Sequence, residues 1–168
     1  MHKQKYRMGT FFGTRQGVTR SGMRGAVAVE FALLLIPLLL LALGVTEYGR
    51  ALYQYNSLVK TVRDSARLLS QYNPTDAASY SLALNDARCL AVHGNTACTG
   101  PSLAPGLTAA MVGIASTTTT TAAGTPITLV EVSITGYVFN FVFNPASLIG
   151  NAVDTIPFGE IRATMRQI

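Results

Sequence analysis

The sequence predicts an α+β protein in which one long N-terminal helix packs on a small antiparallel β-sheet, with a second short helix. Three observations predict this fold. A long apolar stretch near the N-terminus continues into a segment of helical periodicity, a shorter helical segment follows, and alternating apolar and polar residues fill the last third of the chain. Of the 168 residues, 49% are hydrophobic and only 12% are charged. Because soluble domains average about 25% charged residues, this is not the composition of an ordinary cytosolic domain.

Residues 1–25 are predicted to be a basic leader. They contain Lys3, Lys5, Arg7, Arg15, Arg20 and Arg24 and no acidic residue, so this segment carries +6 and the rest of the chain −1, which gives the net charge of +5. A nucleic-acid-binding protein needs a basic face on its folded part, so no nucleic-acid partner is predicted. A basic segment followed by an apolar one instead indicates orientation in a membrane, with the basic residues on the cytoplasmic side.

The apolar segment Ala26–Val45 is predicted to cross a lipid bilayer. Its twenty residues contain one charge, Glu30. As a helix they span about 30 Å, the thickness of the hydrocarbon core. A cleaved secretory signal peptide is the alternative, since it also has a basic start and an apolar core. The long leader, the length of the apolar run and Glu30 favour a retained anchor.

The helix is predicted to continue to Gln71 as an amphipathic segment, because the sequence there lacks proline until Asn73-Pro74. Its apolar residues recur at steps of four and three, which places them on one face. We expect this stripe to pack against the globular part of the chain; a coiled coil with a partner is the alternative, although alanine and tyrosine make a poor coiled-coil seam. The stripe consists of Tyr48, Leu52, Tyr55, Val59, Val62, Ala66 and Leu69.

A second helix is predicted from an N-cap at Thr75 to a closing Gly94. Its expected inner face carries Tyr80, Leu84, Ala87 and Ala91. Strands are predicted at 111–118, 127–143 and 159–167, with a bend at Gly136. In the middle strand Val130, Val132, Ile134 and Val138 are expected on one face. The threonine run 117–121 has strand propensity, and a flexible or O-glycosylated tract is the alternative.

No catalytic site, metal site or cofactor site is predicted. The only histidines are His2 and His93, and the acidic residues are scattered. Cys89 and Cys98 are nine positions apart with a turn between them, and outside the cytoplasm such a pair favours a disulfide. Two unpaired thiols, or a metal site that includes His93, are the alternatives. The sequence therefore predicts a non-catalytic protein.

The decisive motif is Arg24-Gly25-Ala26-Val27-Ala28-Val29-Glu30-Phe31. It resembles the processing site of Flp-type prepilins, in which a glycine precedes the cut and a glutamate and an aromatic residue follow. The stretch that continues to Ser70 resembles the TadE-like family of minor pilins, or pseudopilins, of tight-adherence systems. The elements Glu47-Tyr48-Gly49-Arg50, Asp64-Ser65-Ala66-Arg67 and Ala163-Thr164-Met165-Arg166 also look like the pattern of this family.

The resemblance implies a pilin-like, non-enzymatic subunit for assembly of Flp pili. It implies cleavage between Gly25 and Ala26 by a prepilin peptidase, and a role for Glu30 and Phe31 in recognition or assembly. The expected parts are the removed leader 1–25, a transmembrane half 26–47, an amphipathic half 48–72 and an extracytoplasmic α+β part 73–168.

The partners that the resemblance implies are the prepilin peptidase, the major pilin and other pseudopilins, the inner-membrane assembly platform and the bilayer. The expected location is the bacterial inner membrane, with a periplasmic C-terminal part. The alternative is an envelope binding or adhesin module with an uncleaved anchor or an ordinary signal peptide.

Overall fold

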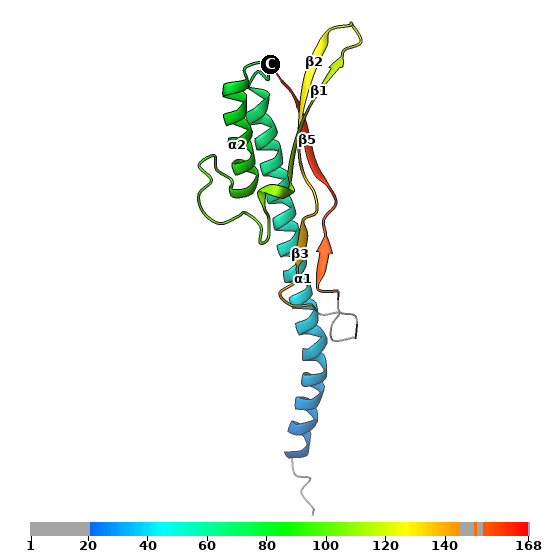
Figure 1. Cartoon of the computed structure of the whole chain (residues 1–168). Coiled ribbons are helices and arrows are strands. Elements are labelled where there is room, and N and C mark those ends of the chain that lie inside the picture. The colour runs from blue at the N-terminus through cyan, green and yellow to red at the C-terminus, as the bar shows by residue number, and fades with distance from the viewer. Residues whose placement is uncertain (1–20, 145–149, 151–152, 168) are drawn as a thin grey trace, which may run out of the picture. The chain divides into compact units, whose positions relative to one another are not determined.

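The computed structural model describes residues 21–144, 150 and 153–167, and it confirms the α+β class (Figure 1). The chain divides into two compact units after Leu39. The helices are α1 (Ser21–Ser70) and α2 (Ala77–His93), with a short 3₁₀ turn at Ala109–Met111. The strands are β1 (Val112–Thr120), β2 (Pro126–Ile134), β3 (Val138–Asn140), β4 (Thr155–Pro157) and β5 (Ile161–Arg166).

Helix α1 begins before the predicted Ala26, ends one residue before the predicted Gln71, and runs through Pro37. Residues 21–25 contain no proline or other strong helix terminator, so the helix can start ahead of the apolar segment. Among the described residues, one helix is long and apolar enough to cross a membrane, Gly25–Ser70. The expected cytoplasmic leader lies outside the described residues up to position 20.

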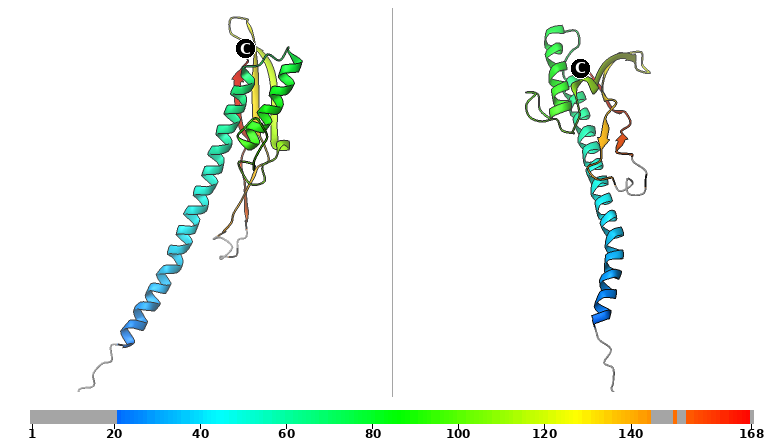
Figure 2. Two further views of the ribbon diagram at one scale, coloured as in Figure 1. Left: turned by 90° about the vertical axis from the view of Figure 1, so that its left-hand side faces the viewer. Right: turned by 60° about the horizontal axis from the view of Figure 1, so that its bottom comes forward.

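The second unit packs around the C-terminal part of α1. Both views in Figure 2 show α2 and the strands alongside this part of the helix. The inner face of α1 carries Leu58, Val62, Ala66 and Leu69, all fully buried. The predicted stripe is therefore correct for Val62, Ala66 and Leu69, which pack within the chain's own core.

The N-terminal half of the predicted stripe is wrong, because Tyr48, Leu52 and Tyr55 are 66%, 44% and 42% exposed. The buried positions there are instead Glu47 and Gln54. Gln54 accepts a hydrogen bond from Tyr137, and Glu47 accepts one from Val142 N, both of which flank β3. These hydrogen bonds compensate the burial of the two polar side chains. Hydrophobic periodicity cannot reveal a helix face of this kind.

Helix α2 is capped at both ends, although not as predicted at its start. Asp76 is the N-cap, and its carboxylate accepts hydrogen bonds from the backbone and hydroxyl of Ser79. Thr75, the predicted cap, instead donates its hydroxyl to the side chain of Asn73. Gly94 closes the helix in the left-handed conformation, as predicted. Buried Ala87 and Ala91 let α2 approach α1 closely, and Ser65 Oγ donates to the carbonyl of Ala87 at 3.0 Å.

The strands form a three-stranded antiparallel sheet in the order β1-β2-β5 and a separate antiparallel pair, β3 and β4. The inward positions predicted in β2 are confirmed, since Val130, Val132 and Ile134 are at most 1% exposed. Val138, predicted on the same face, is exposed, and Phe139 is buried in its place. Gly136, with φ of 72°, breaks the segment between β2 and β3, so the alternation changes phase. Strand β4 was not predicted.

Strand β1 is an edge of the three-stranded sheet and contains Thr117–Thr120. The bond from Thr135 N to Met111 O and the register with β2 direct the backbone groups of Gly113, Ala115 and Thr117 to β2. The backbone groups of the even-numbered residues after Val112 point to the open edge. The threonine run is therefore mostly strand.

Candidate functional site: the processing segment and a polar clasp

The residues predicted for processing and assembly lie in the first unit, on α1. Gly25 and Ala26 are consecutive helical residues, and an added Cβ at Gly25 would meet no atom within 4 Å. Glu30 is exposed one turn further along, and in the described part of the chain it forms no ion pair. Phe31 is 64% exposed. These four residues thus share one short and uncovered helical segment.

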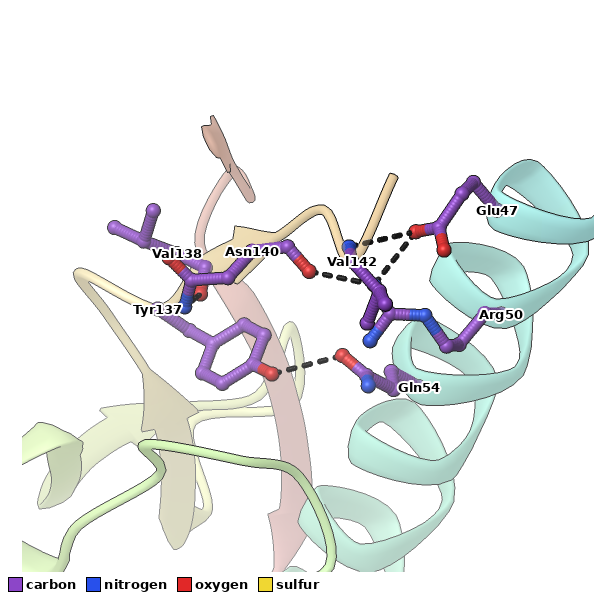
Figure 3. A network of polar contacts seen from close by, with 7 residues as sticks. All are labelled: Glu47, Arg50, Gln54, Tyr137, Val138, Asn140 and Val142. Carbon is purple, nitrogen blue, oxygen red and sulfur yellow. Dashed lines mark hydrogen bonds and ion pairs between the residues drawn. The ribbon is translucent and has the colours of Figure 1, made fainter. Parts of the chain in front are cut away.

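A second polar cluster, here called the clasp, lies in the second unit (Figure 3). It consists of Glu47 and Arg50 on α1 with the backbone of Asn140 and Val142. Arg50 Nη2 lies 2.6 Å from Glu47 Oε2 and donates to the Asn140 carbonyl at 2.6 Å. Val142 N donates to the same Glu47 oxygen at 3.3 Å. The clasp therefore joins α1 to a segment about ninety positions away in the sequence.

Tyr137 and Gln54 extend this contact one helical turn further. The hydroxyl of Tyr137 donates to Gln54 Oε1 at 2.9 Å and lies 3.2 Å from the carbonyl oxygen of Pro105. Tyr137 is 2% exposed and Gln54 is 6% exposed. Burial raises the pKa of Tyr137 above its ordinary value of 10.0, and the nearby Arg50 opposes this only in part. At neutral pH the phenol is therefore a neutral, fixed hydrogen-bond donor.

Aromatic rings complete the surroundings of the clasp. The Arg50 guanidinium carbon lies 4.5 Å from the centroid of the fully buried Phe139 ring. Phe139 also contacts Phe141 edge to face and stacks with Phe158 at a centroid distance of 6.2 Å. A guanidinium over an aromatic face is attracted by the electron-rich face of the ring, and the Arg50 side chain here is 31% exposed. The arrangement holds two segments together and pairs its charges, which suits a structural role.

Helix α1 carries both the residues predicted for processing and assembly and the clasp side chains Glu47 and Arg50. Residues 25–67 match the family of TadE-like proteins. The predicted resemblance is thereby confirmed. No curated protein and no solved structure matches the chain. The TadE-like family is a family of non-enzymatic proteins associated with Tad pili.

The TadE-like segment contains the four residues predicted for processing and assembly and both side chains of the clasp from α1. Sequence reasoning selected Glu47 and Arg50 only as part of a motif, and it missed Gln54 and Tyr137. The spacing of Glu47, Arg50 and Gln54 by three and four positions was a usable signal, because it places three polar side chains on one helix face.

The two cysteines lie outside the TadE-like segment. Cys89 and Cys98 form a disulfide, with their Cα atoms 4.8 Å apart. His93, which the metal alternative required, has its Nδ1 3.0 Å from the carbonyl oxygen of Gly100. Within the described ranges no group of three or more His, Cys, Asp or Glu residues is placed to hold a metal ion. The disulfide closes the turn that follows α2.

Proposed function

We propose that this chain is a minor pilin, or pseudopilin, that remains anchored in the membrane and acts in the assembly of Flp-type pili. The observation that carries the proposal is the position of the TadE-like match, which starts at Gly25. This is the residue after which the sequence predicts the cut. Cleavage there removes the basic leader and leaves the apolar helix on the mature chain.

Glu30 supplies the chemistry of assembly in this proposal. A carboxylate in hydrocarbon costs at least about 2.5 kcal/mol, so it needs a compensating partner. Cleavage creates a positive α-amino group on Ala26, at a helix N-terminus where negative charge is favoured. Glu30 of one subunit then neutralises the Ala26 amine of a neighbouring subunit, and each charge is satisfied on docking. Phe31 adds an exposed ring beside this contact.

The orientation proposed is a cytoplasmic N-terminus and a periplasmic C-terminal part. It rests on the six basic residues before the apolar segment. A disulfide between Cys89 and Cys98 suits a compartment outside the cytoplasm. The partners proposed are the prepilin peptidase, the major pilin and other pseudopilins, and the assembly platform of the inner membrane.

The processing step is tested by the mass of the mature protein in cells that contain the cognate prepilin peptidase. We expect a chain that begins at Ala26. Gly25→Leu blocks the cut without disturbing packing, because no atom lies within 4 Å of an added Cβ. Gly22→Leu is the matched control and is cut normally. A mature chain that begins after Val45 would indicate an ordinary signal peptide and contradict the proposal.

The assembly role is tested by co-purification. The membrane-extracted protein, crosslinked in cells, is expected to retain the major Flp pilin. An alkaline phosphatase fused after Ile168 is expected to be active, which checks the orientation. A protein that stays in the membrane, retains residues 1–25 and captures no pilus subunit would instead support the anchored envelope module.

A further inference from the structure

Several exposed apolar side chains of the second unit lie at one level of the molecule, whereas Leu82, 67% exposed, lies apart from them on α2. Val142 is 82% exposed, Val153 is 58% exposed and Ile156 is 43% exposed. Tyr48 on α1 is 66% exposed. It lies at the same level as Val142, since its neighbour Glu47 accepts a hydrogen bond from Val142 N. We call this group of four side chains the apolar patch. No large hydrophobic side chain of the β1 and β2 hairpin is exposed to this extent.

An apolar groove adjoins the patch. Its volume is about 310 Å³ and its walls are mainly apolar. It lies between α1, β4 and the residues that follow β3, and its lining consists of Gly44, Glu47, Tyr48, Ala51, Phe141, Asn144 and Ile156. The one charge in the lining, Glu47, is paired with Arg50 in the clasp. The groove therefore presents hydrocarbon walls and a neutralised carboxylate.

The position of the groove along α1 places it at the membrane surface, if the apolar segment spans the bilayer. Gly44 belongs to the apolar segment that ends at Val45. Tyr48 lies about 4.5 Å beyond Val45 along a helix, and tilting the helix shortens that depth. The headgroup layer on each side of the hydrocarbon core is roughly 5–7 Å thick. Tyr48 therefore lies inside this layer, and Val142 lies at the same depth.

The first aromatic residue after Val45 suits a membrane interface. Tyr48 is exposed on α1, and tyrosine is enriched where a protein passes through the headgroups. Exposed apolar patches in soluble surroundings mark an interaction site. Here the apolar patch and groove adjoin the apolar segment of α1, so membrane lipid is the partner expected to cover them.

We propose that the end of the globular part that carries the apolar patch rests in the outer headgroup layer, with a lipid acyl chain in the groove. The bilayer then holds the protein at two places, by the spanning segment and by this patch. The inference rests on the proposed function only in taking α1 as a membrane anchor. Of the charges beside the patch, Glu47 is paired with Arg50, and Asp154 accepts a hydrogen bond from Asn144.

The test uses tryptophan fluorescence, because the chain contains no tryptophan. Single variants Val142→Trp, Leu34→Trp and Thr119→Trp of the full chain are reconstituted in vesicles of phosphatidylethanolamine and phosphatidylglycerol, with and without brominated acyl chains. Leu34→Trp reports the spanning segment. Thr119→Trp is the matched control, since Thr119 is exposed on β1 away from the patch.

We expect brominated lipid to quench most of the emission of Leu34→Trp and a large part of that of Val142→Trp, with a blue shift in both. Thr119→Trp should show neither effect. If Leu34→Trp is quenched while Val142→Trp behaves like Thr119→Trp, the anchor stands and the patch does not touch lipid. If Leu34→Trp is not quenched, the anchor itself is wrong. Val153→Trp repeats the measurement at a second exposed position, so a local defect at one site cannot decide the outcome.

Discussion

The guanidinium of Arg50 lies over the ring of Phe139, 4.5 Å from its centroid, while its Nη2 joins Glu47 to the carbonyl of Asn140. One side chain from the TadE-like segment thus reaches a buried ring, a carboxylate and the backbone of β3. This relationship connects the part of the chain that matches the family to the part that does not.

Removing the charge of Arg50 is expected to loosen this connection. Arg50→Met keeps most of the apolar stem but loses the ion pair, the bond to Asn140 and the contact with the Phe139 ring. We expect a loss of about 2 kcal/mol in the unfolding free energy of the globular part. Denaturant unfolding in detergent micelles, followed by near-ultraviolet circular dichroism, measures it. Arg63→Met is the matched control, since Arg63 is exposed on the same helix and forms no ion pair in the described part of the chain. Equal unfolding free energies of the two variants would show that the clasp does not stabilise the globular part.

Tyr137 is expected to make the folded state sensitive to alkali. Its pKa is raised by burial, so the unfolded state loses this proton at lower pH than the folded state. The contribution to stability is complete below pH 10.0 and falls as the pH rises through the raised pKa. Thermal unfolding across this range should show a smaller alkaline decline in Tyr137→Phe than in the natural chain. At neutral pH the variant should lose about 1–2 kcal/mol, because Gln54 loses its donor. Identical alkaline slopes would contradict the assignment.

Glu30→Leu is expected to insert in the membrane but to fail in pilus assembly. The substitution lowers the cost of insertion and removes the partner of the Ala26 amine. Cell fractionation measures insertion, and shear-released pili measure assembly. Glu30→Asp, which keeps the charge on a shorter side chain, is expected to retain part of the assembly. Normal piliation in a strain that carries only Glu30→Leu would show that this charge does not direct docking.

The disulfide is expected to stabilise the turn after α2 without affecting the anchor. A loop of this length contributes roughly 2.5–3 kcal/mol in the chain-entropy account. Replacing Cys89 and Cys98 together with serine should lower the unfolding free energy by at most that amount and leave membrane insertion unchanged. Peptide mapping without reductant should recover the two cysteine peptides joined. Complete alkylation of both thiols in unreduced protein would contradict the bridge.

The edge position of β1 predicts an alternating pattern of amide hydrogen exchange. The amides of Ala115 and Thr117 bond to β2, whereas those of Ile114 and Ser116 point away from the sheet. We expect slow exchange for the first pair and fast exchange for the second, resolved by nuclear magnetic resonance of the protein in micelles. Uniform protection along the strand would mean that another strand covers this edge.

Much of the fold could be predicted because it depends on local patterns. Apolar length gave the part of α1 that is long and apolar enough to span a membrane, and periodicity gave Val62, Ala66 and Leu69 as its buried face. Gly94 and Gly136 marked a helix end and a bend through their backbone freedom. The residues that carry the TadE-like resemblance are consecutive in the chain, so no tertiary structure was needed to recognise them.

Tertiary structure alone decided the face of α1 just beyond the apolar segment. Glu47 and Gln54 are buried because Val142 and Tyr137, from distant segments, provide their hydrogen bonds. Tyr48 is left exposed by the same packing. Burial of a polar side chain depends on a partner that a local sequence window does not contain, whereas burial of an apolar one depends mainly on its own surface. The sequence by itself therefore determined the apolar segment of α1, the TadE-like resemblance and the buried face at the C-terminal end of α1, and only the folded chain decided where the clasp and the apolar patch lie.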